Sequence, residues 1–253
     1  MSEIDIRPGE FRDASGEAEF PKGNTHTREP QIYFAGDLIS IYSAFRNQIY
    51  NPSSVLYPSC GFDASPARVF SNVTFVDKEE GNERCVSKLQ EAGLNALKQD
   101  IRKYHPKNVH DLLILLNPSI PTEWASKHLK SGGYILANNY HGNATEMYGQ
   151  PDQFDLWGTI DFVEKNISKG DNRVVISRNL EGLFEPVANE EELKRFRPEY
   201  YEFLGGVFRA FALNMRNFNA DRPFEEVWAD YREMMQEGMP SKKIADRYVF
   251  VKK

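Results

Sequence analysis

SVLYPSCGFDASPARVF, residues 54–70, contains the turn that decides the fold. The apolar run that ends at Tyr57 suits a buried strand, and the Pro-Ser-Cys-Gly sequence after it ends that strand. Gly61 allows the backbone to turn sharply and to approach a ligand closely, because no Cβ obstructs it. Asp63 follows two residues later, just before a short helix expected at 66–70. We therefore expect a strand–loop–helix unit with a ligand at its loop.

Outward from this unit, apolar runs alternate with helical patterns over much of the chain. Strands are expected at 55–57, 73–76, 94–98, 111–116, 134–137, 154–162 and 247–252, with a further short strand or hairpin arm at 173–176. Helices are expected at 32–50, 66–70, 83–92 and 123–129, and a turn at 131–133. Continuous apolar strands separated by helices indicate a parallel sheet covered on both faces. The predicted fold class is α/β, a three-layer, doubly wound, mostly parallel sheet of seven strands.

The predicted domain organisation follows from where these patterns stop. Residues 1–30 lack apolar periodicity and are expected to form an N-terminal arm, whereas 31–253 form one domain. Before the last strand, apolar residues recur every three to four positions, which predicts a helical insertion at 182–240. Such an insertion either closes over a substrate or enlarges the core.

Composition narrows the class of partner. The chain has 253 residues, of which 40% are hydrophobic, and a net charge of −6 with a pI of about 5.5. The hydrophobic share is sufficient for a substantial core. The acidic balance argues against a nucleic-acid partner, because phosphate binding needs a basic surface. We expect a small-molecule or protein substrate, and the sequence predicts no oligomeric state.

Cysteine and histidine usage argues against structural cross-links and metal centres. Cys60 and Cys85 are too few for a disulfide framework, and the chain has no Cys/His cluster or HExxH-type motif, so no metal site is expected. Cys60 is expected to be a small buried residue rather than a nucleophile. The sequence starts without a signal-peptide pattern and has no apolar run of bilayer length. The predicted location is cytoplasmic, with no membrane partner.

Polar residues gather where the predicted strands end. In open parallel sheets the ligand lies beyond the carboxyl ends of the strands. At such an end, Asp77 either accepts two hydrogen bonds from a ribose diol or is a solvated acid. Asp100 either accepts a hydrogen bond from an adenine amino group or caps a helix before Ile101. Asp63 either holds a ligand's ammonium group or caps the helix that follows it.

The succession of a glycine loop, Asp77, Asp100 and Asn117-Pro118 at four strand ends resembles the class I S-adenosylmethionine-dependent methyltransferase family, which has a Rossmann-like fold. The resemblance covers about 52–165 and the closing strand. It implies that this last strand runs antiparallel to the rest of the sheet. It also implies that S-adenosyl-L-methionine is the cofactor, and that its methyl group is transferred to a small molecule or a protein side chain.

The resemblance also implies which residues contact the cofactor. The loop from Tyr57 to Asp63, which includes Gly61, corresponds to the methionine side of the site. Asp77 corresponds to the residue that binds the ribose. Asp100 corresponds to the residue that faces the adenine.

The loop departs from the family's first motif, which is acid-x-Gly-x-Gly-x-Gly. Here Tyr57 replaces the acid, Ser59 and Asp63 replace two glycines, and Gly61 remains. These changes favour one alternative, a catalytically inactive protein of the same fold that acts in binding or interaction. A second alternative is a nicotinamide-dependent oxidoreductase. The three-glycine fingerprint of that class is absent, which argues against it.

Two residues are candidates for the methyl-acceptor side. The sequence Asn117-Pro118-Ser119-Ile120 resembles the Asn-Pro-Pro-aromatic motif of amino-group methyltransferases, in which the asparagine polarises the amine. It lacks the second proline and the aromatic, and the alternative is a proline that simply ends a buried strand. His141 follows the fifth strand and is either a general base, with a pKa near neutrality, or a polar loop residue. The predicted catalytic residues are His141 and Asn117.

Overall fold

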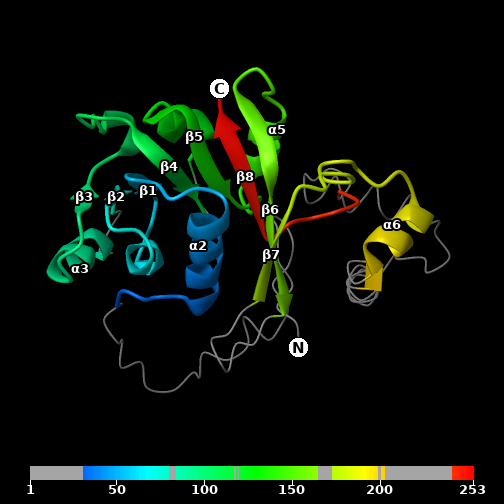
Figure 1. Ribbon diagram of the computed structural model, residues 1–253, viewed down its shortest axis with the longest axis horizontal. Coiled ribbons are helices and arrows are strands. Elements are labelled where there is room, and N and C mark those ends of the chain that lie inside the picture. Colours follow the sequence, from blue (N-terminus) through cyan, green and yellow to red (C-terminus); the bar gives the residue numbers. More distant parts are fainter. Residues whose placement is uncertain are drawn as a thin grey trace, which may run out of the picture. The chain divides into compact units, whose positions relative to one another are not determined.

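The computed structural model describes residues 31–79, 84–116, 118, 120–164, 173–198, 201–202 and 241–253 (Figure 1). The chain divides into two compact units. The first comprises Met1–Asn179 together with Ala245–Lys253, and the second is Leu180–Ile244. All the strands of the sheet belong to the first unit.

An eight-stranded sheet forms the centre of the first unit. Its strands are β1 (Val55–Pro58), β2 (Val73–Asp77), β3 (Ala96–Lys98), β4 (His110–Leu115), β5 (Leu129–Ala137), β6 (Phe154–Glu164), β7 (Arg173–Ser177) and β8 (Arg247–Lys252). Their order across the sheet is β3-β2-β1-β4-β5-β8-β6-β7. The strands from β1 to β5 are parallel, whereas β8 is antiparallel to β5 and β6, and β7 is antiparallel to β6. The expected mixed α/β sheet, mostly parallel with an antiparallel last strand, is confirmed.

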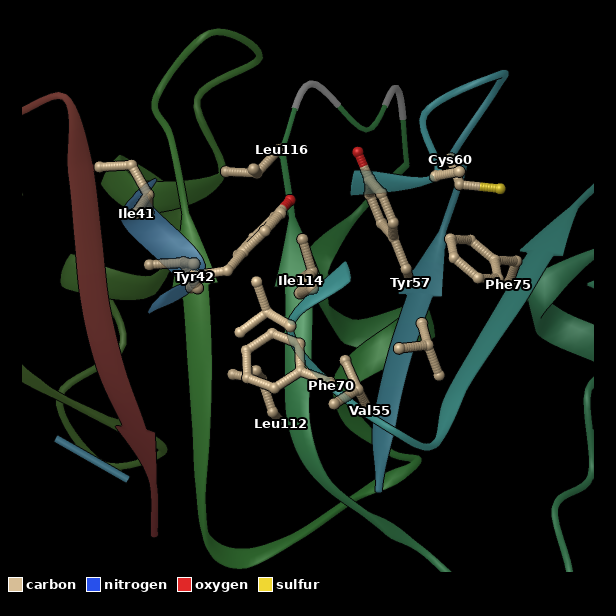
Figure 2. Packing of buried hydrophobic residues seen from close by; sticks show 14 of the residues in the cluster. Ile41, Tyr42, Val55, Tyr57, Cys60, Phe70, Phe75, Leu112, Ile114 and Leu116 are labelled. Carbon is tan, nitrogen blue, oxygen red and sulfur yellow. The ribbon is translucent and has the colours of Figure 1, made fainter. Parts of the chain in front are cut away.

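The apolar runs form the central strands because these strands are buried on both faces. Every residue of β1 and β4 is buried. The helix α2 (Gly36–Gln48) packs onto the sheet through Ile41, Tyr42 and Phe45, which are fully buried. Figure 2 shows Tyr42 and Phe70 packed near the residues of β1 and β4, and their ring centroids lie 5.9 Å apart. Each such side chain contributes about 1.5–3 kcal/mol through burial.

Short helices connect the parallel strands. They are η1 (Ser65–Arg68), α3 (Cys85–Glu91), η2 (Ile101–Lys103), α4 (Thr122–Ser126) and α5 (Asn143–Tyr148). The helix expected at 66–70 is the short 3-10 turn η1, with Pro66 in its first turn. Helix α2 ends ahead of Asn51-Pro52, as predicted, because the residue before a proline disfavours the helical conformation.

Two details of the sheet differ from the sequence predictions. The segment at 173–176 forms a full strand, β7, which pairs with β6 and makes the sheet eight-stranded rather than seven-stranded. The turn predicted at 131–133 was wrong, because β5 already begins at Leu129 and continues through these residues. Gly132 has a φ of 74°, and the pairing of β5 with β4 shifts its register. The glycine therefore marks an irregularity within a strand and not its beginning.

The second unit contains the helix α6 (Glu190–Phe196). The side chain of Asn189 caps this helix by accepting a hydrogen bond from the Glu192 N–H over 3.0 Å. Most of the helical insertion predicted at 182–240 lies outside the described residues, as does the predicted arm at 1–30, and both remain predictions. In the parts of the chain that the structure describes, no helix combines the length and apolarity needed to cross a membrane.

Candidate ligand-binding site

The loop after β1 turns through two residues with positive φ. Ser59 has a φ of 51° and Gly61 a φ of 53°. Ser59 thus adopts the left-handed conformation that glycine accommodates best, although it carries a side chain. Its N–H donates to the carbonyl of Val76 over 2.9 Å, which ties the loop to the end of β2. Cys60, between them, is buried as expected, and burial raises the pKa of its thiol, which does not favour a nucleophile.

The structure brings Gly61 and Asp77 together. The Gly61 N–H donates to Oδ2 of Asp77 over 3.0 Å, and the Glu79 N–H donates to Oδ1 over 2.9 Å. Each carboxylate oxygen therefore has capacity for a further hydrogen bond, and the Asp77 side chain is only partly buried. A Cβ placed on Gly61 would meet no atom within 4 Å. The end of β2 thus presents an acid with spare acceptor capacity beside open space at the glycine.

Tyr57 and Asp63 point into the protein. The Tyr57 hydroxyl donates to Oδ2 of Asp63 over 3.0 Å, and Oδ1 accepts hydrogen bonds from the N–H, over 2.8 Å, and the hydroxyl of Ser65. Burial raises the pKa of Asp63, and these hydrogen bonds partly oppose that rise. The carboxylate therefore holds the backbone and the hydroxyl of Ser65, the first residue of η1, and Tyr57 supports it from β1.

The segment before α2 covers one side of the same loop. The Tyr33 N–H donates to the carbonyl of Phe62, and the Ala64 N–H donates to the carbonyl of Tyr33, each over 3.0 Å. The Ala35 N–H donates to the Ser65 hydroxyl over 2.8 Å. Backbone groups from 62 to 64 are thus engaged within the protein, which leaves the side of Gly61 and Asp77 for a ligand.

Asp100 caps a short helix. Its Oδ1 accepts a hydrogen bond from the Arg102 N–H over 2.9 Å, and its carboxylate forms an ion pair with the Arg102 guanidinium at 2.5 Å. The hydrogen bonds from Arg102 hold the pKa of Asp100 well below its usual range. The guanidinium also lies over the Trp124 ring, 4.6 Å from its centroid. Asp100 lies near Asp77 in the sheet, because the Gln99 N–H donates to the Asp77 carbonyl over 2.8 Å.

The acceptor-side candidates are only partly described. Asn117 lies outside the described residues, and Pro118, next to it, is buried. His141 is exposed in the loop after β5, where its ring meets the edge of Tyr140 with the centroids 4.8 Å apart. Partial desolvation lowers the pKa of His141, which favours the neutral form of the ring, the form that can accept a proton. Among the described residues, no three His, Cys, Asp or Glu side chains are grouped as metal ligands would be.

Glu79 is a structural residue of the site that the sequence analysis missed. Its Oε2 accepts a hydrogen bond from the Val86 N–H over 2.9 Å, at the start of α3, and its Oε1 pairs with Lys98 at 2.9 Å. The hydrogen bond from Lys98 lowers the pKa of Glu79. In the sequence, Glu79 is one of several charged residues in a row after Asp77 and belongs to no motif, whereas in the structure it connects β2, β3 and α3.

No protein-family model matches the chain, and no curated protein matches it significantly. Solved structures with a similar fold include the N-methyltransferase NodS from Bradyrhizobium japonicum in complex with S-adenosyl-L-homocysteine, at 13% identity and a TM-score of 0.39. That similarity covers 56% of this chain and 83% of NodS. A SAM-dependent methyltransferase from Thermotoga maritima is 16% identical with a TM-score of 0.42, again over 56% and 83% of the two chains. The sugar N-methyltransferase KedS8 from Streptoalloteichus is 15% identical with a TM-score of 0.34, over 55% and 57%. None of these values bears on activity.

Proposed function

We propose that this chain binds S-adenosyl-L-methionine at the carboxyl edge of β1 to β3 and transfers its methyl group to an acceptor. The observation that carries the proposal is the hydrogen bond from the Gly61 N–H to Asp77. It sets an acid with spare acceptor capacity at the end of β2, beside a glycine turn at the end of β1. In open α/β sheets this edge is where nucleotide-like ligands bind, and the acid after the second strand accepts hydrogen bonds from a ribose.

The residues at this edge fit such a cofactor at its ribose end. Asp77 has one unused lone pair on each oxygen, and no atom stands within 4 Å of a Cβ position on Gly61. Bound S-adenosyl-L-methionine would supply a methyl group on a positively charged sulfur. Tyr57 and Asp63 would act through the loop, since their polar atoms hold each other and Ser65. Asp100, held by Arg102, would face the adenine.

The contribution of the protein to methyl transfer would be mainly alignment. Holding two reactants in line converts a bimolecular encounter into an effectively unimolecular step, which can lower the barrier by about 7–11 kcal/mol. A base is needed only if the attacking atom is protonated. His141, exposed and with a lowered pKa, would then accept the proton, and Asn117 would orient the acceptor.

Calorimetric titration with S-adenosyl-L-methionine and S-adenosyl-L-homocysteine tests the cofactor. We expect saturable binding of both, and weakening by about 100-fold in Asp77→Ala, because two hydrogen bonds to a charged acceptor are lost. Asp155→Ala is the matched control, since Asp155 is an exposed acid on β6, near the other end of the sheet. Absence of binding by the wild type would contradict the proposal.

The second candidate is a protein of the same fold that binds a ligand or partner without catalysis. It is favoured by the internal pairing of Asp63 with Tyr57 and of Asp100 with Arg102, which uses acids that a cofactor would otherwise engage. Transfer of a labelled methyl group to any acceptor separates the two candidates. Titration with NAD and NADP tests the remaining alternative, an oxidoreductase.

A further inference from the structure

Three buried polar atoms have no hydrogen-bond partner in the described part of the chain. They are the Tyr42 hydroxyl, Nε of Arg247 and Oδ1 of Asn143. An unsatisfied buried polar group costs about 1–3 kcal/mol, so such groups call for an explanation. Two of them, on Tyr42 and Arg247, are hydrogen-bond donors, whereas Oδ1 of Asn143 is an acceptor.

The two donors lie toward the same edge of the sheet. Arg247 is the first residue of β8 and pairs with Ile160, and the next residue, Tyr248, pairs with Ala137, the last residue of β5. Arg247 therefore lies beyond the carboxyl end of β5. Figure 2 shows the hydroxyl of Tyr42 close to Leu116, at the carboxyl end of β4. The charge of Arg247 acts on the phenol of Tyr42, opposing the effect of burial, which raises the pKa of that phenol.

Arg247 has no acidic partner among the described residues. Its Nη1 donates to the carbonyl of Asp246, which satisfies one of its five N–H groups. Asp63 of the glycine loop is already held by Tyr57 and Ser65, and the acids next to Arg247 accept backbone hydrogen bonds, Asp161 from the Asp246 N–H and Asp246 from the Phe162 N–H. A half-buried guanidinium without a counter-ion is costly, and an anionic ligand would offset that cost.

We propose that the methyl acceptor carries a carboxylate, which Arg247 binds through its guanidinium and Tyr42 binds through its hydroxyl. A guanidinium presents paired N–H donors that match the two oxygens of a carboxylate, and a phenol supplies a third donor. The position of Arg247 suits an acceptor rather than the proposed ribose site. Arg247 lies next to β5 at the start of β8, whereas Gly61 and Asp77 lie at the ends of β1 and β2. The identification of the ligand as a methyl acceptor rests on the proposed methyltransferase function. The binding of a carboxylate at Arg247 can be tested independently of that function.

The test observes the Arg247 Nε–H directly by ¹H–¹⁵N NMR of the full chain, with Arg247→Lys used to assign its signal. The probes are matched pairs with and without a carboxylate: histidine and histamine, tyrosine and tyramine, tryptophan and tryptamine. We expect at least one carboxylate to shift the signal saturably below about 10 mM, and its decarboxylated partner not to do so. Absence of a saturable shift with all three amino acids, or equal shifts with the amines, would overturn the proposal.

Variants test the contribution of each donor. Arg247→Met should weaken binding of the active carboxylate by about tenfold or more, and Tyr42→Phe by a smaller factor. Arg178→Met, which removes an exposed arginine beyond the end of β7, should leave binding unchanged. Thermal unfolding of each variant reports folding, and Tyr42→Phe removes only an unsatisfied hydroxyl. Equal binding by wild type and a folded Arg247→Met would count against the proposal.

The carboxylate could instead belong to the cofactor. Titration with S-adenosyl-L-homocysteine and with methylthioadenosine, which lacks the carboxylate, separates these sources. If Arg247→Met weakens the binding of S-adenosyl-L-homocysteine only, the arginine binds the carboxylate of the cofactor and the acceptor proposal fails. If the wild type binds neither adenosine compound, the proposed function fails, while a carboxylate-dependent shift of Arg247 would still establish the anion site.

Discussion

Ser59 stands where the resemblance implies a glycine, and it keeps a glycine-like backbone with a φ of 51°. The sequence showed the substitution but not that the backbone conformation survives it. The sequence also could not show that Tyr57 and Asp63 bond to each other, because that depends on side-chain rotamers and on Ser65. By contrast, the approach of Gly61 to Asp77 was predictable, since neighbouring parallel strands bring their carboxyl ends together.

Ser59→Gly should stabilise the protein. A side chain in the left-handed region costs about 1–2 kcal/mol, and the greater freedom of glycine in the unfolded chain returns part of that gain. We expect a net increase of about 0.5–1 kcal/mol in the free energy of unfolding, measured by urea denaturation. Ser71→Gly, in an exposed loop without positive φ, is the control and should be neutral or slightly destabilising. Destabilisation of Ser59→Gly relative to this control would contradict the strain argument.

At the scale of elements, periodicity predicted each strand and most helices. It failed where single residues or local hydrogen bonds determine the backbone conformation. The continuous strand through Gly132 and the short η1 in place of a helix are examples. The start of β4 is another. His110 lies there with Nδ1 2.7 Å from the Ser54 hydroxyl and Nε2 2.8 Å from the Tyr104 hydroxyl. The sequence showed only a scattered histidine, because its two side-chain partners, Ser54 and Tyr104, come from two other segments of the chain.

His110 should lower the free energy of unfolding as the pH falls below 6.5. Burial, with a smaller effect of His128, lowers the pKa of His110 to about 4, against about 6.5 in the unfolded chain. Between these pH values the proton binds to His110 in the unfolded state only. The stabilising contribution of neutral His110 is therefore complete above pH 6.5 and is lost as the pH falls toward 4. The loss is at most about 1.4 kcal/mol per pH unit.

Glutamine in His110→Gln cannot titrate, so the variant removes this contribution, while groups that do not interact with His110 titrate equally in both proteins. Urea unfolding between pH 4 and pH 7 should show wild type losing more stability on acidification than the variant. The carboxyl of Asp63, whose pKa burial raises, acts in the opposite direction in both proteins and cancels in the difference. Parallel pH profiles for the two proteins would contradict the prediction, because they would mean that burial does not lower the pKa of His110.

At the scale of the whole sheet, the last strand in sequence lies in its interior. β8 separates β5 from β6 and pairs with both, so β6 and β7 join the parallel strands only through it. The sequence predicted a closing strand from the alternation in RYVFVK, and the resemblance implied its antiparallel direction. Its place between β5 and β6 could not be read from periodicity, because strand order is a property of tertiary packing. Arg247 lies beyond the carboxyl end of β5 only because β8 is inserted beside that strand.

Phe250→Ala should therefore destabilise the whole first unit and not only its C-terminal end. Phe250 is fully buried at the middle of β8, opposite Ile135 of β5 and Leu156 of β6. Truncating a buried phenylalanine costs about 3–5 kcal/mol, which is a large part of the stability of a typical domain. Val251→Ala is the matched control on the same strand, since Val251 is half-buried and this truncation should cost about 1 kcal/mol.

Hydrogen exchange should show β1 and β4 losing protection together with β6 in Phe250→Ala, because a two-stranded β6–β7 hairpin is only marginally stable alone. Loss confined to β6 and β7, with β1 and β4 unaffected, would mean that the parallel strands fold independently of β8.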